Sequence, residues 1–326
     1  MRHPVRYPLR RIVVLLALCT STLAVQAFDL QGHRGARGLA PENTLAAFRT
    51  AIAVGVDTLE LDVHLSADGV PMVVHDPALN RDLTRDAQGE WLAATGPLIG
   101  SVSAAELQSK FRLGRARPAS SIANTFPEQK PSDAERLPRL SEVLALMREP
   151  GREALRANIE IKLNPKRPDD TPAPEAIVRA VLAVLRDAGV ERRVTLQGFD
   201  WRALRIAQQL APRIPTAYLS AQRPNFDTVS DGTWSAGFDL KTHGSLPKMV
   251  KAAGGAIWSP NFNDLSPALI AEAHALGLQV LPWTVNQAED MARLIDWGVD
   301  GLITDYPDRA RRVMADKKLP LPPAGR

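Results

Sequence analysis

The chain has 326 residues, with 40 Lys and Arg against 36 Asp and Glu, and one cysteine. Residues 1–27 contain four arginines, no acid and that cysteine, so the rest of the chain is balanced in charge and free of cysteine. This balance excludes the basic surface that nucleic-acid binding needs, and the lack of cysteine excludes a fold held by disulfides. A chain of this length can instead bury a hydrophobic core large enough to stabilise it.

Residues 1–27 have the order of a secretory signal peptide. Arginines precede an apolar stretch from Ile12 to Leu18, and small and polar residues continue to Ala27. A membrane anchor is the alternative, but this stretch is far shorter than the ~20 apolar residues that span a bilayer. Leu18 precedes Cys19 where a lipid-modified cysteine needs a small residue. We therefore predict cleavage after Ala27, export to the periplasm, and no stable membrane insertion of the mature protein.

From residue 28 onward, short apolar runs alternate with helical patterns, which is typical of parallel βα units. The runs that we predict to be strands are Asp29–His33, Thr58–Asp62, Asn158–Lys162, Val194–Gly198, Thr216–Ser220, Ala256–Ser259, Gln279–Thr284 and Gly301–Asp305. Eight strand–helix repeats predict an α/β fold, a (β/α)8 TIM barrel over residues 28–316, with its chemistry at the carboxyl ends of the strands.

Cap and turn residues mark the ends of several intervening helices. We predict a helix over Thr44–Val54, capped by Asn43 and closed by Gly55. The same kinds of signal enclose two further helices, between Ser266-Pro267 and Gly277 and between Asn286 and Gly298.

One apolar run, Val70–His75, follows the second strand after only Ala67-Asp68-Gly69. These residues are too few for a helical crossover, and Asp-Gly between alternating strands is typical of a tight hairpin. We therefore predict that the second strand continues past the barrel rim and folds back. A two-residue Asp-Gly loop would place Asp62 opposite His75 on the same face of the hairpin.

Two segments lack the βα pattern. Residues 79–136 are rich in Pro, Gly, Ser and Arg, and we predict a loop-rich insertion over the barrel mouth that faces substrate or acts as a lid. Residues 317–326 are short, charged and rich in Pro, which predicts a disordered tail.

Acidic residues recur at spacing two on the predicted strands. Glu60 and Asp62 share one face of the second strand, and their apolar neighbours indicate a buried strand rather than a surface strand, where two acids would be harmless. Two carboxylates pointing into a barrel repel unless a cation holds them. Glu160 and Lys162 repeat the pattern on the next barrel strand, although a surface Glu–Lys pair is the alternative. Three carboxylates favour a hard cation, Ca²⁺ or Mg²⁺.

Histidines and an arginine lie near these acids. His33 and Arg34 stand between glycines at the end of the first strand, where the backbone can approach a ligand closely. The planar guanidinium of Arg34 suits phosphate oxygens. His33 and His75 beside a carboxylate cluster suit general acid–base hydrolysis, because imidazole titrates near neutrality.

With these motifs the chain resembles the glycerophosphodiester phosphodiesterases, especially the exported bacterial type. The motifs that carry the resemblance are GHRGARGLAPENT (Gly32–Thr44), ELDVHLSADG (Glu60–Gly69), VVHD (Val73–Asp76), LPRLSEVL (Leu137–Leu144), IEIK (Ile159–Lys162), WTVN (Trp283–Asn286) and GLITDYP (Gly301–Pro307). The resemblance extends from Phe28 to about Ala315 and implies a (β/α)8 barrel.

The resemblance also implies an activity and roles for single residues. The implied reaction is metal-dependent hydrolysis of glycerophosphodiesters to sn-glycerol 3-phosphate and an alcohol. The implied metal ligands are Glu60, Asp62 and Glu160, the acid–base pair is His33 and His75, and the phosphate is bound by Arg34 and Lys162. Trp283 would form an aromatic wall beside the glycerol or alcohol group, with a packed core Trp as the alternative. Glu42 would support the site from behind, with a simple position near the helix cap as the alternative.

The chain departs from the family pattern at Gln197-Gly198-Phe199, where the family often has Gln-Ser-Phe. Two other functions stay open: a lysophospholipase D or toxin-like phospholipase on the same barrel, and an envelope binding protein without catalysis. The choice between Ca²⁺ and Mg²⁺, the preferred headgroup, the role of each histidine and the oligomeric state also stay open.

Overall fold

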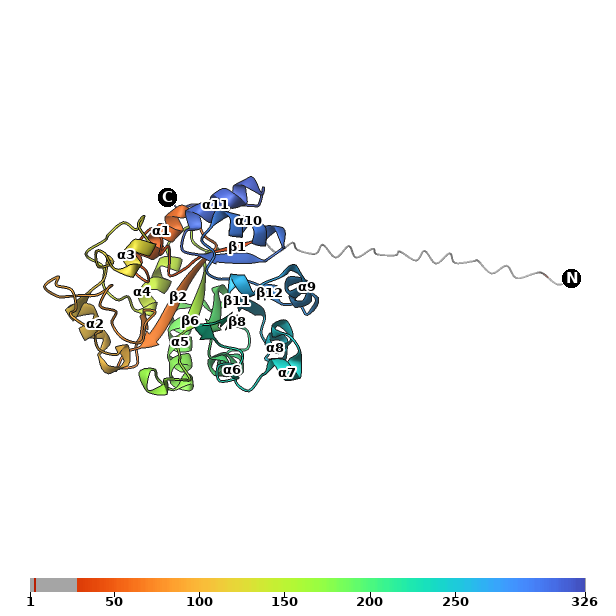
Figure 1. The fold of residues 1–326 in the computed structure, drawn as a ribbon, viewed down its shortest axis with the longest axis horizontal. Helices are drawn as coiled ribbons and strands as arrows, with labels where there is room; N and C mark the ends of the chain where they lie inside the picture. The colour runs from red at the N-terminus through yellow and green to blue at the C-terminus, as the bar shows by residue number, and fades with distance from the viewer. Residues whose placement is uncertain (1–2, 4–27, 326) are drawn as a thin grey trace.

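The computed structural model describes His3 and residues 28–325, so the predicted signal peptide lies outside the described residues, apart from His3. In this part of the chain, eight parallel strands form a nearly closed barrel, which confirms the predicted fold class (Figure 1). In spatial order they are β12 (Gln279–Val280), β11 (Ile257–Pro260), β8 (Thr216–Ser220), β7 (Val194–Gly198), β6 (Arg156–Ile161), β2 (Thr58–Leu65), β1 (Asp29–Gly32) and β13 (Gly301–Thr304). Asp300 N donates to Val280 O at 3.0 Å and brings β13 back to β12.

Helices cover the outside of the barrel (Figure 1). They are α1 (Leu45–Val54), α4 (Leu140–Met147), α5 (Pro174–Ala188), α6 (Trp201–Leu210), α7 (Leu240–His243), α8 (Leu246–Ala252), α9 (Pro267–Ala275), α10 (Ala288–Asp296) and α11 (Pro307–Asp316). Single 3-10 turns are η1 (Ile99–Ser101), η2 (Pro168–Asp170), η3 (Glu191–Arg193) and η4 (Phe262–Asp264). Within the part of the chain that the structure describes, none of the helices has the length and apolarity needed to span a bilayer.

Alternation along β2 divides its side chains between the two faces of the barrel wall. Leu59, Leu61 and Val63 are fully buried in the main hydrophobic core, which the strands share with the surrounding helices. Because successive side chains of a strand point to opposite faces, Glu60 and Asp62 point into the barrel. The same alternation that builds the core therefore aims both acids at the interior.

Two asparagines that we predicted as helix caps have other partners. Thr44, not Asn43, caps α1, and its side chain accepts from Ala47 N. Gln287, not Asn286, precedes α10. The side-chain amides of Asn43 and Asn286 instead donate to carboxylates at the barrel mouth, at 2.9 Å and 2.7 Å. Each predicted helix start was therefore correct to within one residue, but the two asparagines form hydrogen bonds in the site instead of capping the helices.

The predicted hairpin forms, but with a different register. β3 (Pro71–Val73) pairs antiparallel with β2, and Val63 lies opposite Val73. The loop has three residues rather than two, because Ser66 N donates to Val70 O at 3.0 Å and Gly69 has a φ of 75°. The extra loop residue shifts the pairing by one position. His75 therefore does not lie opposite Asp62, and it comes after β3 has ended.

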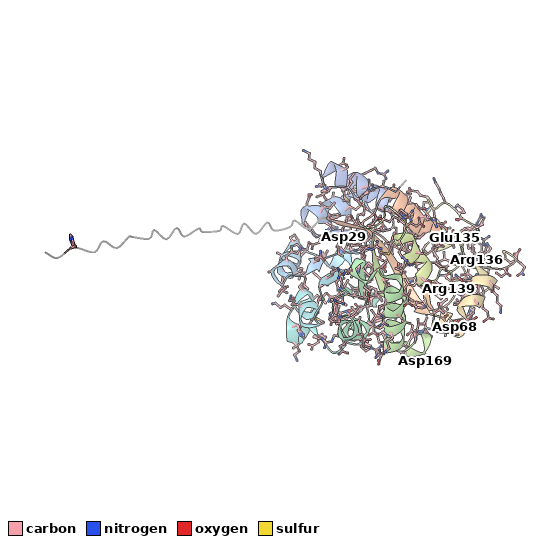
Figure 2. The ribbon with its side chains drawn as sticks, turned by 180° about the vertical axis from the view of Figure 1, so that it is seen from behind. Asp29, Asp68, Glu135, Arg136, Arg139 and Asp169 are labelled. Atoms are coloured by element: carbon pink, nitrogen blue, oxygen red, sulfur yellow. The ribbon has the colours of Figure 1, made fainter. Side chains whose placement is uncertain are left out.

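The insertion of residues 79–136 packs against the hairpin (Figure 1). It contains short elements, namely β4 (Arg85–Asp86), α2 (Ala104–Lys110), β5 (Phe111–Arg112) and α3 (Ser121–Thr125). A small hydrophobic core holds them together, and its members are Met72, Leu79, Ile99, Ala104, Leu107, Leu113 and Leu137. At the hairpin loop, Asp68, labelled in Figure 2, accepts from Ala104 N at 2.9 Å. The loop-rich segment therefore has a fixed place beside the barrel.

The C-terminal tail contacts the barrel helices. Residues 317–325 run back over α1, where Gly325 N donates to Ile52 O at 2.9 Å. The Arg311 guanidinium donates to Pro322 O at 2.6 Å and to Gly55 O at 3.0 Å. These backbone contacts come from residues far away in the sequence, so composition alone could not reveal them.

Candidate active site

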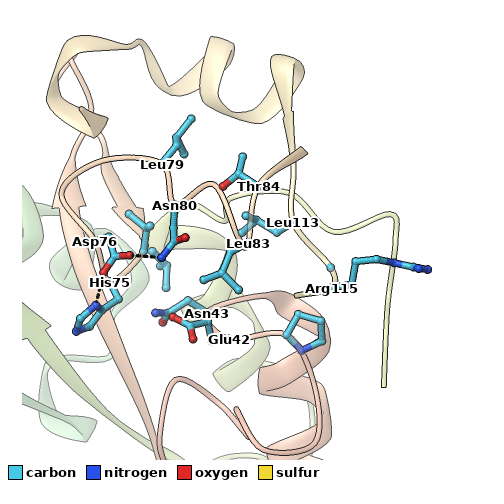
Figure 3. Close-up of a pocket in the computed structure, with 14 residues that line it drawn as sticks. Glu42, Asn43, His75, Asp76, Leu79, Asn80, Leu83, Thr84, Leu113 and Arg115 are labelled. Carbon is cyan, nitrogen blue, oxygen red and sulfur yellow. Dashed lines mark hydrogen bonds and ion pairs between the residues drawn. The ribbon is translucent and has the colours of Figure 1, made fainter. Parts of the chain in front are cut away.

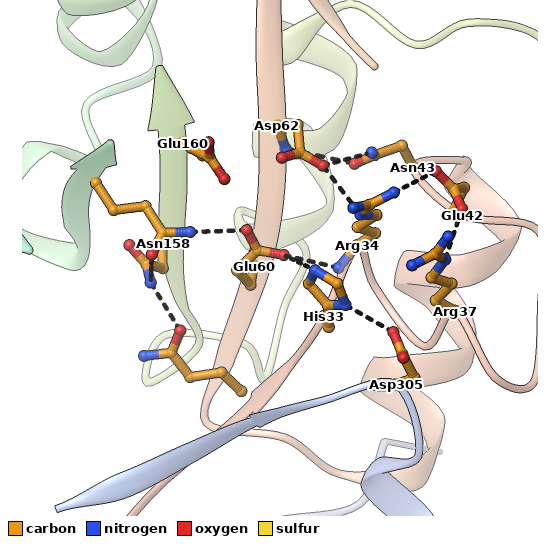
Figure 4. A network of polar contacts seen from close by, with 12 residues as sticks. His33, Arg34, Arg37, Glu42, Asn43, Glu60, Asp62, Asn158, Glu160 and Asp305 are labelled. Carbon is orange, nitrogen blue, oxygen red and sulfur yellow. Dashed lines mark hydrogen bonds and ion pairs between the residues drawn. The ribbon is translucent and has the colours of Figure 1, made fainter. Parts of the chain in front are cut away.

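Three carboxylates meet inside the barrel near the carboxyl ends of β2 and β6 (Figure 4). Glu60 and Asp62 are each 1% exposed and Glu160 is 7% exposed. One oxygen from each lies within 4.8 Å of the others. Asp62 and Glu160 are register partners on the adjacent parallel strands, which is why residues about a hundred positions apart converge.

Burial and mutual repulsion make this cluster unfavourable in its fully charged form. Burial, with the charge of Asp62, raises the pKa of Glu60 well above its ordinary value. Burial raises the pKa of Glu160 to about 7, although Lys162 opposes this effect. A set of three carboxylate oxygens that repel one another fits a hard divalent cation, which would compensate their charge.

Asp62 behaves differently from the two glutamates. Burial would raise its pKa, but His75, Lys162 and Arg34 hold the pKa of this carboxyl well below its ordinary value. Asn43 Nδ2 also donates to Asp62 Oδ2 at 2.9 Å. Asp62 is therefore the carboxylate that the surrounding positive groups keep charged.

Polar side chains deeper in the barrel support the cluster from below. Gln197 Nε2 donates to Glu60 Oε1 at 2.7 Å. Asn158 Nδ2 in turn donates to Gln197 Oε1 at 2.9 Å and to Gln31 Oε1 at 2.8 Å. These amides satisfy the buried oxygens that face away from the mouth. Sequence reasoning missed this layer, although each amide has the inward parity of its strand.

Arg34 and Lys162 bring positive charge to the acids. The Arg34 backbone N–H donates to Glu60 Oε2 at 2.8 Å, and its Nε lies 3.4 Å from Asp62 Oδ2. Lys162 Nζ donates to Glu160 Oε1 at 2.7 Å and lies 3.6 Å from Asp62 Oδ1. Burial opposes the charge of Lys162, but Glu160 and Asp62 raise its pKa above the ordinary value. Arg34 and Lys162 therefore both carry a positive charge at the mouth of the barrel.

Glu42 lies behind Arg34 and fixes its guanidinium. Arg34 Nη1 donates to Glu42 Oε1 at 2.6 Å, and Arg37 Nε lies 2.6 Å from Glu42 Oε2. Burial alone would raise the pKa of Glu42, but the two arginines lower it, so this carboxyl stays ionised. Sequence reasoning missed Arg37, which lies in the same glycine-rich motif and balances the second oxygen of Glu42.

His33 lies at the end of β1 between two carboxylates (Figure 4). Its Nδ1 bonds to Asp305 Oδ1 at 2.6 Å, and its Nε2 lies 4.0 Å from Glu60 Oε2. Asn286 Nδ2 donates to the other oxygen of Asp305 at 2.7 Å. Burial lowers the pKa of His33, against the raising effect of Asp305. Asp305 and Asn286 belong to motifs that we quoted, but we had predicted no part in the site for Asp305 and only a helix-end position for Asn286.

His75 is supported, like His33, by an aspartate and an asparagine. Its Nδ1 bonds to Asp76 Oδ1 at 2.7 Å, and Asn80 Nδ2 donates to Asp76 Oδ2 at 2.8 Å (Figure 3). Burial lowers the pKa of His75 to about 4, with Arg34 and Lys162 acting in the same direction.

His64 lies two residues after Asp62 on the same face of β2. It is 3% exposed, and its Nε2–H donates to the backbone oxygen of His75 at 3.1 Å. It contributes to holding the segment that carries His75.

An open cavity of about 300 Å³ lies over the cluster. Its polar lining includes His75, Glu160 and Lys162. Its aromatic lining consists of Phe199, Phe226, Trp234 and Trp283. Phe199 packs edge-on against Trp283 and Phe226, with ring centres 5.3 Å and 5.0 Å apart. The cavity therefore offers a charged wall and an apolar wall to one ligand.

The aromatic wall comes from three separate loops. Trp283 follows β12, Phe199 follows β7, and Phe226 lies on the small hairpin of β9 (Gln222–Arg223) and β10 (Phe226–Asp227) after β8. Sequence reasoning identified only Trp283. The position of Phe199 directly after a strand could have revealed it, but the hairpin carried no motif.

A second space next to the site is too narrow for substrate. It is an apolar slot of about 30 Å³ between Asn43 and the insertion residues Leu79 and Leu83, beside His75 (Figure 3). This volume holds about one water molecule. The larger, polar and aromatic cavity is therefore where a substrate fits.

Relatives in other organisms match nearly the whole chain. A glycerophosphodiester phosphodiesterase of Bacillus altitudinis is 30% identical and aligns over 88% of this chain and 98% of its own. A glycerophosphodiester phosphodiesterase of Caldanaerobacter subterraneus subsp. tengcongensis is 28% identical over 85% of this chain and 93% of its own.

Solved structures show the same fold. A Silicibacter pomeroyi protein described as a glycerophosphoryl diester phosphodiesterase has a TM-score of 0.81 and 39% identity, over 90% of this chain and 95% of its own. An Oleispira antarctica phosphodiesterase, solved with its product sn-glycerol-3-phosphate, has a TM-score of 0.64 and 22% identity, over 88% of this chain and 96% of its own.

The barrel, the ionic cluster at its mouth and these similarities define the class of the protein as a phosphoric diester hydrolase built on a (β/α)8 barrel. Residues 33–309 match the model of the glycerophosphoryl diester phosphodiesterase family, and the chain belongs to this family.

Proposed function

We propose that this enzyme is exported and hydrolyses glycerophosphodiesters to sn-glycerol 3-phosphate and an alcohol, with a divalent cation and two histidines. The observation that carries this proposal is a cluster of three buried carboxylates beside the cavity. Next to them lie the positively charged side chains of Arg34 and Lys162 and two histidines, each bound to an aspartate. The Oleispira phosphodiesterase with bound sn-glycerol-3-phosphate supports the choice of product.

The cation would be held by Glu60, Asp62 and Glu160, and we propose Ca²⁺ or Mg²⁺. The exclusively carboxylate character of this group and its buried repulsion support a hard cation. A divalent cation, when bound, polarises a phosphoryl oxygen and favours attack at phosphorus.

Arg34 and Lys162 would bind the phosphate and stabilise the negative charge that builds up in the transition state. Both side chains are already oriented by acids, through Glu42 for Arg34 and Glu160 for Lys162. Preoriented cations lose little freedom when the substrate arrives, so their charge acts fully in the transition state.

His33 and His75 would perform the proton transfers. One imidazole takes the proton of the attacking oxygen, which belongs to water or to the glycerol 2-hydroxyl, and the other protonates the departing alcohol. In both residues Nδ1 is bound to an aspartate, at 2.6 Å and 2.7 Å, which leaves Nε2 for substrate.

Trp283 and the aromatic residues beside it would bind the carbon atoms of the glycerol or alcohol group. The Trp283 indole N–H donates to Ser259 O at 2.9 Å, which fixes the ring at the cavity wall. A cavity lined by both aromatic and charged side chains suits a substrate with a phosphate at one end and carbon at the other.

Release of sn-glycerol 3-phosphate from glycerophosphocholine tests this proposal. We expect turnover with Mg²⁺ or Ca²⁺, loss of turnover in EDTA, and loss in His33→Ala and His75→Ala proteins that still fold by circular dichroism. Near-normal turnover in either variant would refute the histidine assignment. Faster turnover of lysophosphatidylcholine than of glycerophosphocholine would favour a lysophospholipase D, and tight binding of glycerophosphocholine without turnover would favour a binding protein.

A further inference from the structure

We propose that Asn80 positions His75, and that the insertion of residues 79–136 serves to hold Asn80 in place. The inference rests on the proposed acid–base role of His75. It assigns the insertion a part in building the site, in addition to any covering of the mouth.

The barrel alone does not fix His75. β3 ends at Val73, and His75 follows it, outside the strand pairing. Its side chain is 33% exposed, against 13% for His33. Backbone pairing with β2 ends at Val74, whose N–H donates to Asp62 O at 3.0 Å, so the ring of His75 must be oriented by side-chain contacts.

Those contacts form a chain of hydrogen bonds. Asn80 Nδ2 donates to Asp76 Oδ2 at 2.8 Å, and Asp76 Oδ1 accepts from His75 Nδ1 at 2.7 Å (Figure 3). His64 Nε2–H donates to the backbone oxygen of His75 at 3.1 Å and so fixes the backbone of His75. A carboxylate on Nδ1 selects the tautomer with Nε2 free, and a donor on the far carboxylate oxygen holds that carboxylate in place.

His33 has the same chain, built from different parts. Asn286 Nδ2 donates to Asp305 Oδ2 at 2.7 Å, and Asp305 Oδ1 bonds to His33 Nδ1 at 2.6 Å. Asp305 directly follows β13, and Asn286 lies in the connection from β12 to α10. The barrel itself thus orients His33. For His75, the corresponding asparagine lies in the insertion.

The small core of the insertion determines where Asn80 lies. Its neighbour Leu79 is 1% exposed and packs in that core, together with Leu107. The Leu79 backbone pairs with the later part of the insertion, since its N–H donates to Pro97 O at 3.0 Å and its oxygen accepts from Gly96 N at 2.8 Å. Asn80 is therefore anchored by residues that never approach the cavity.

A matched pair of substitutions tests the role of Asn80. Asn80→Asp keeps the oxygen that accepts from Asp82 N at 2.9 Å, but it replaces the donor to Asp76 with a second acid. Asn286→Asp does the same beside Asp305, since the Asn286 oxygen accepts from Asp305 N at 3.0 Å. For glycerophosphocholine we expect kcat to fall about tenfold or more in each variant, the effect of about one lost hydrogen bond, with KM changed less than about threefold.

The ring nitrogens supply a readout that a general loss of stability would not produce. Long-range ¹H–¹⁵N NMR spectra of the wild type should show the Nδ1–H tautomer for both His33 and His75. Asn80→Asp should disturb this pattern at His75 only, and Asn286→Asp at His33 only.

Truncation inside the insertion core tests the anchoring. Leu107→Ala should lower kcat, and adding it to Asn80→Asp should cause little further loss, because both changes act through the same contact. Leu185→Ala in α5 is the matched control. Leu185 is also fully buried, but in the main core, so its truncation should lower thermal stability and leave kcat unchanged.

The possible results separate this inference from the proposed function. If His75→Ala is inactive while Asn80→Asp retains wild-type kcat and the His75 tautomer, the positioning role is wrong. If Leu107→Ala has normal kcat, or lowers kcat as strongly with Asn80→Asp as without it, the anchoring by the insertion is wrong. If His75→Ala is itself active, the proposed acid–base function fails, and the inference fails with it.

Discussion

Asp62 and Glu160 face each other in register on the neighbouring parallel strands β2 and β6. Both side chains point into the barrel, and Glu60 joins them because it lies two residues before Asp62 on the same face. Two short acidic motifs, far apart in the chain, thus form one candidate cation site.

Replacement of Glu160 by Gln removes one of three repelling carboxylates at constant size. In EDTA we expect the variant to melt at a higher temperature than the wild type, because burial disfavours the charge of Glu160 more strongly than Lys162 favours it. Saturating Mg²⁺ or Ca²⁺ should stabilise the wild type more than it stabilises the variant. The activity of the variant should be lower than that of the wild type by about 100-fold or more. Thermal unfolding with and without cation measures the first effect. An active variant that gains as much from cation as the wild type would contradict the site.

Arg34→Lys should damage catalysis although it keeps the charge. Arg34 contacts both Glu42 and Asp62 through its planar guanidinium, which a lysine cannot reproduce. We expect kcat/KM for glycerophosphocholine to fall by about 100-fold. Arg37→Lys is the control, because Arg37 contacts Glu42 on the side away from the carboxylate cluster. An equal loss in both variants would indicate that Arg34 acts only as a partner of Glu42.

Phe226→Ala should weaken substrate binding more than turnover. Phe226 is 40% exposed and forms the outer part of the aromatic wall. We expect KM for glycerophosphocholine to rise about threefold, the effect of about one lost aromatic contact, with kcat nearly unchanged. Leu210→Ala is a matched control, because Leu210 is also 40% exposed but lies at the end of α6 and does not line the cavity. Equal KM values for Phe226→Ala and the wild type would exclude the hairpin from substrate binding.

Expression of the full chain in a Gram-negative host should yield a mature protein that begins at Phe28. The reason is the order of arginines, apolar stretch and small residues in the first 27 positions. Intact-mass measurement of the periplasmic and cytoplasmic fractions checks the cleavage position and the location. A chain that starts at residue 28 should remain in the cytoplasm, and an uncleaved full-length product in the cytoplasm would contradict export.

Strand positions and the inward direction of the acids were predictable because they follow from local patterns. Alternation of apolar and polar residues indicated both the core face and the site face of β2, and the eight strands were confirmed at nearly the predicted positions. The place of His75 was not predictable in this way. One additional loop residue in the hairpin shifted the register, because Asp-Gly suits both a two-residue turn and a three-residue loop that ends with Gly at positive φ.

The sequence by itself determined the order of the strands, the side of the barrel to which each acid belongs, and the candidate motifs, because these depend on residues that are near neighbours in the chain. Only the tertiary structure decided that Asn80, Asp76 and His75 form a chain of hydrogen bonds. The same holds for the aromatic lining, where Phe226 and Trp234 join Trp283, and for the ion pair of Arg37 with Glu42. These contacts depend on the paths of the loops that carry the side chains. The contact of Asn80 also depends on the small core of the insertion. Such paths are set by packing over the whole molecule, and local sequence patterns do not encode them.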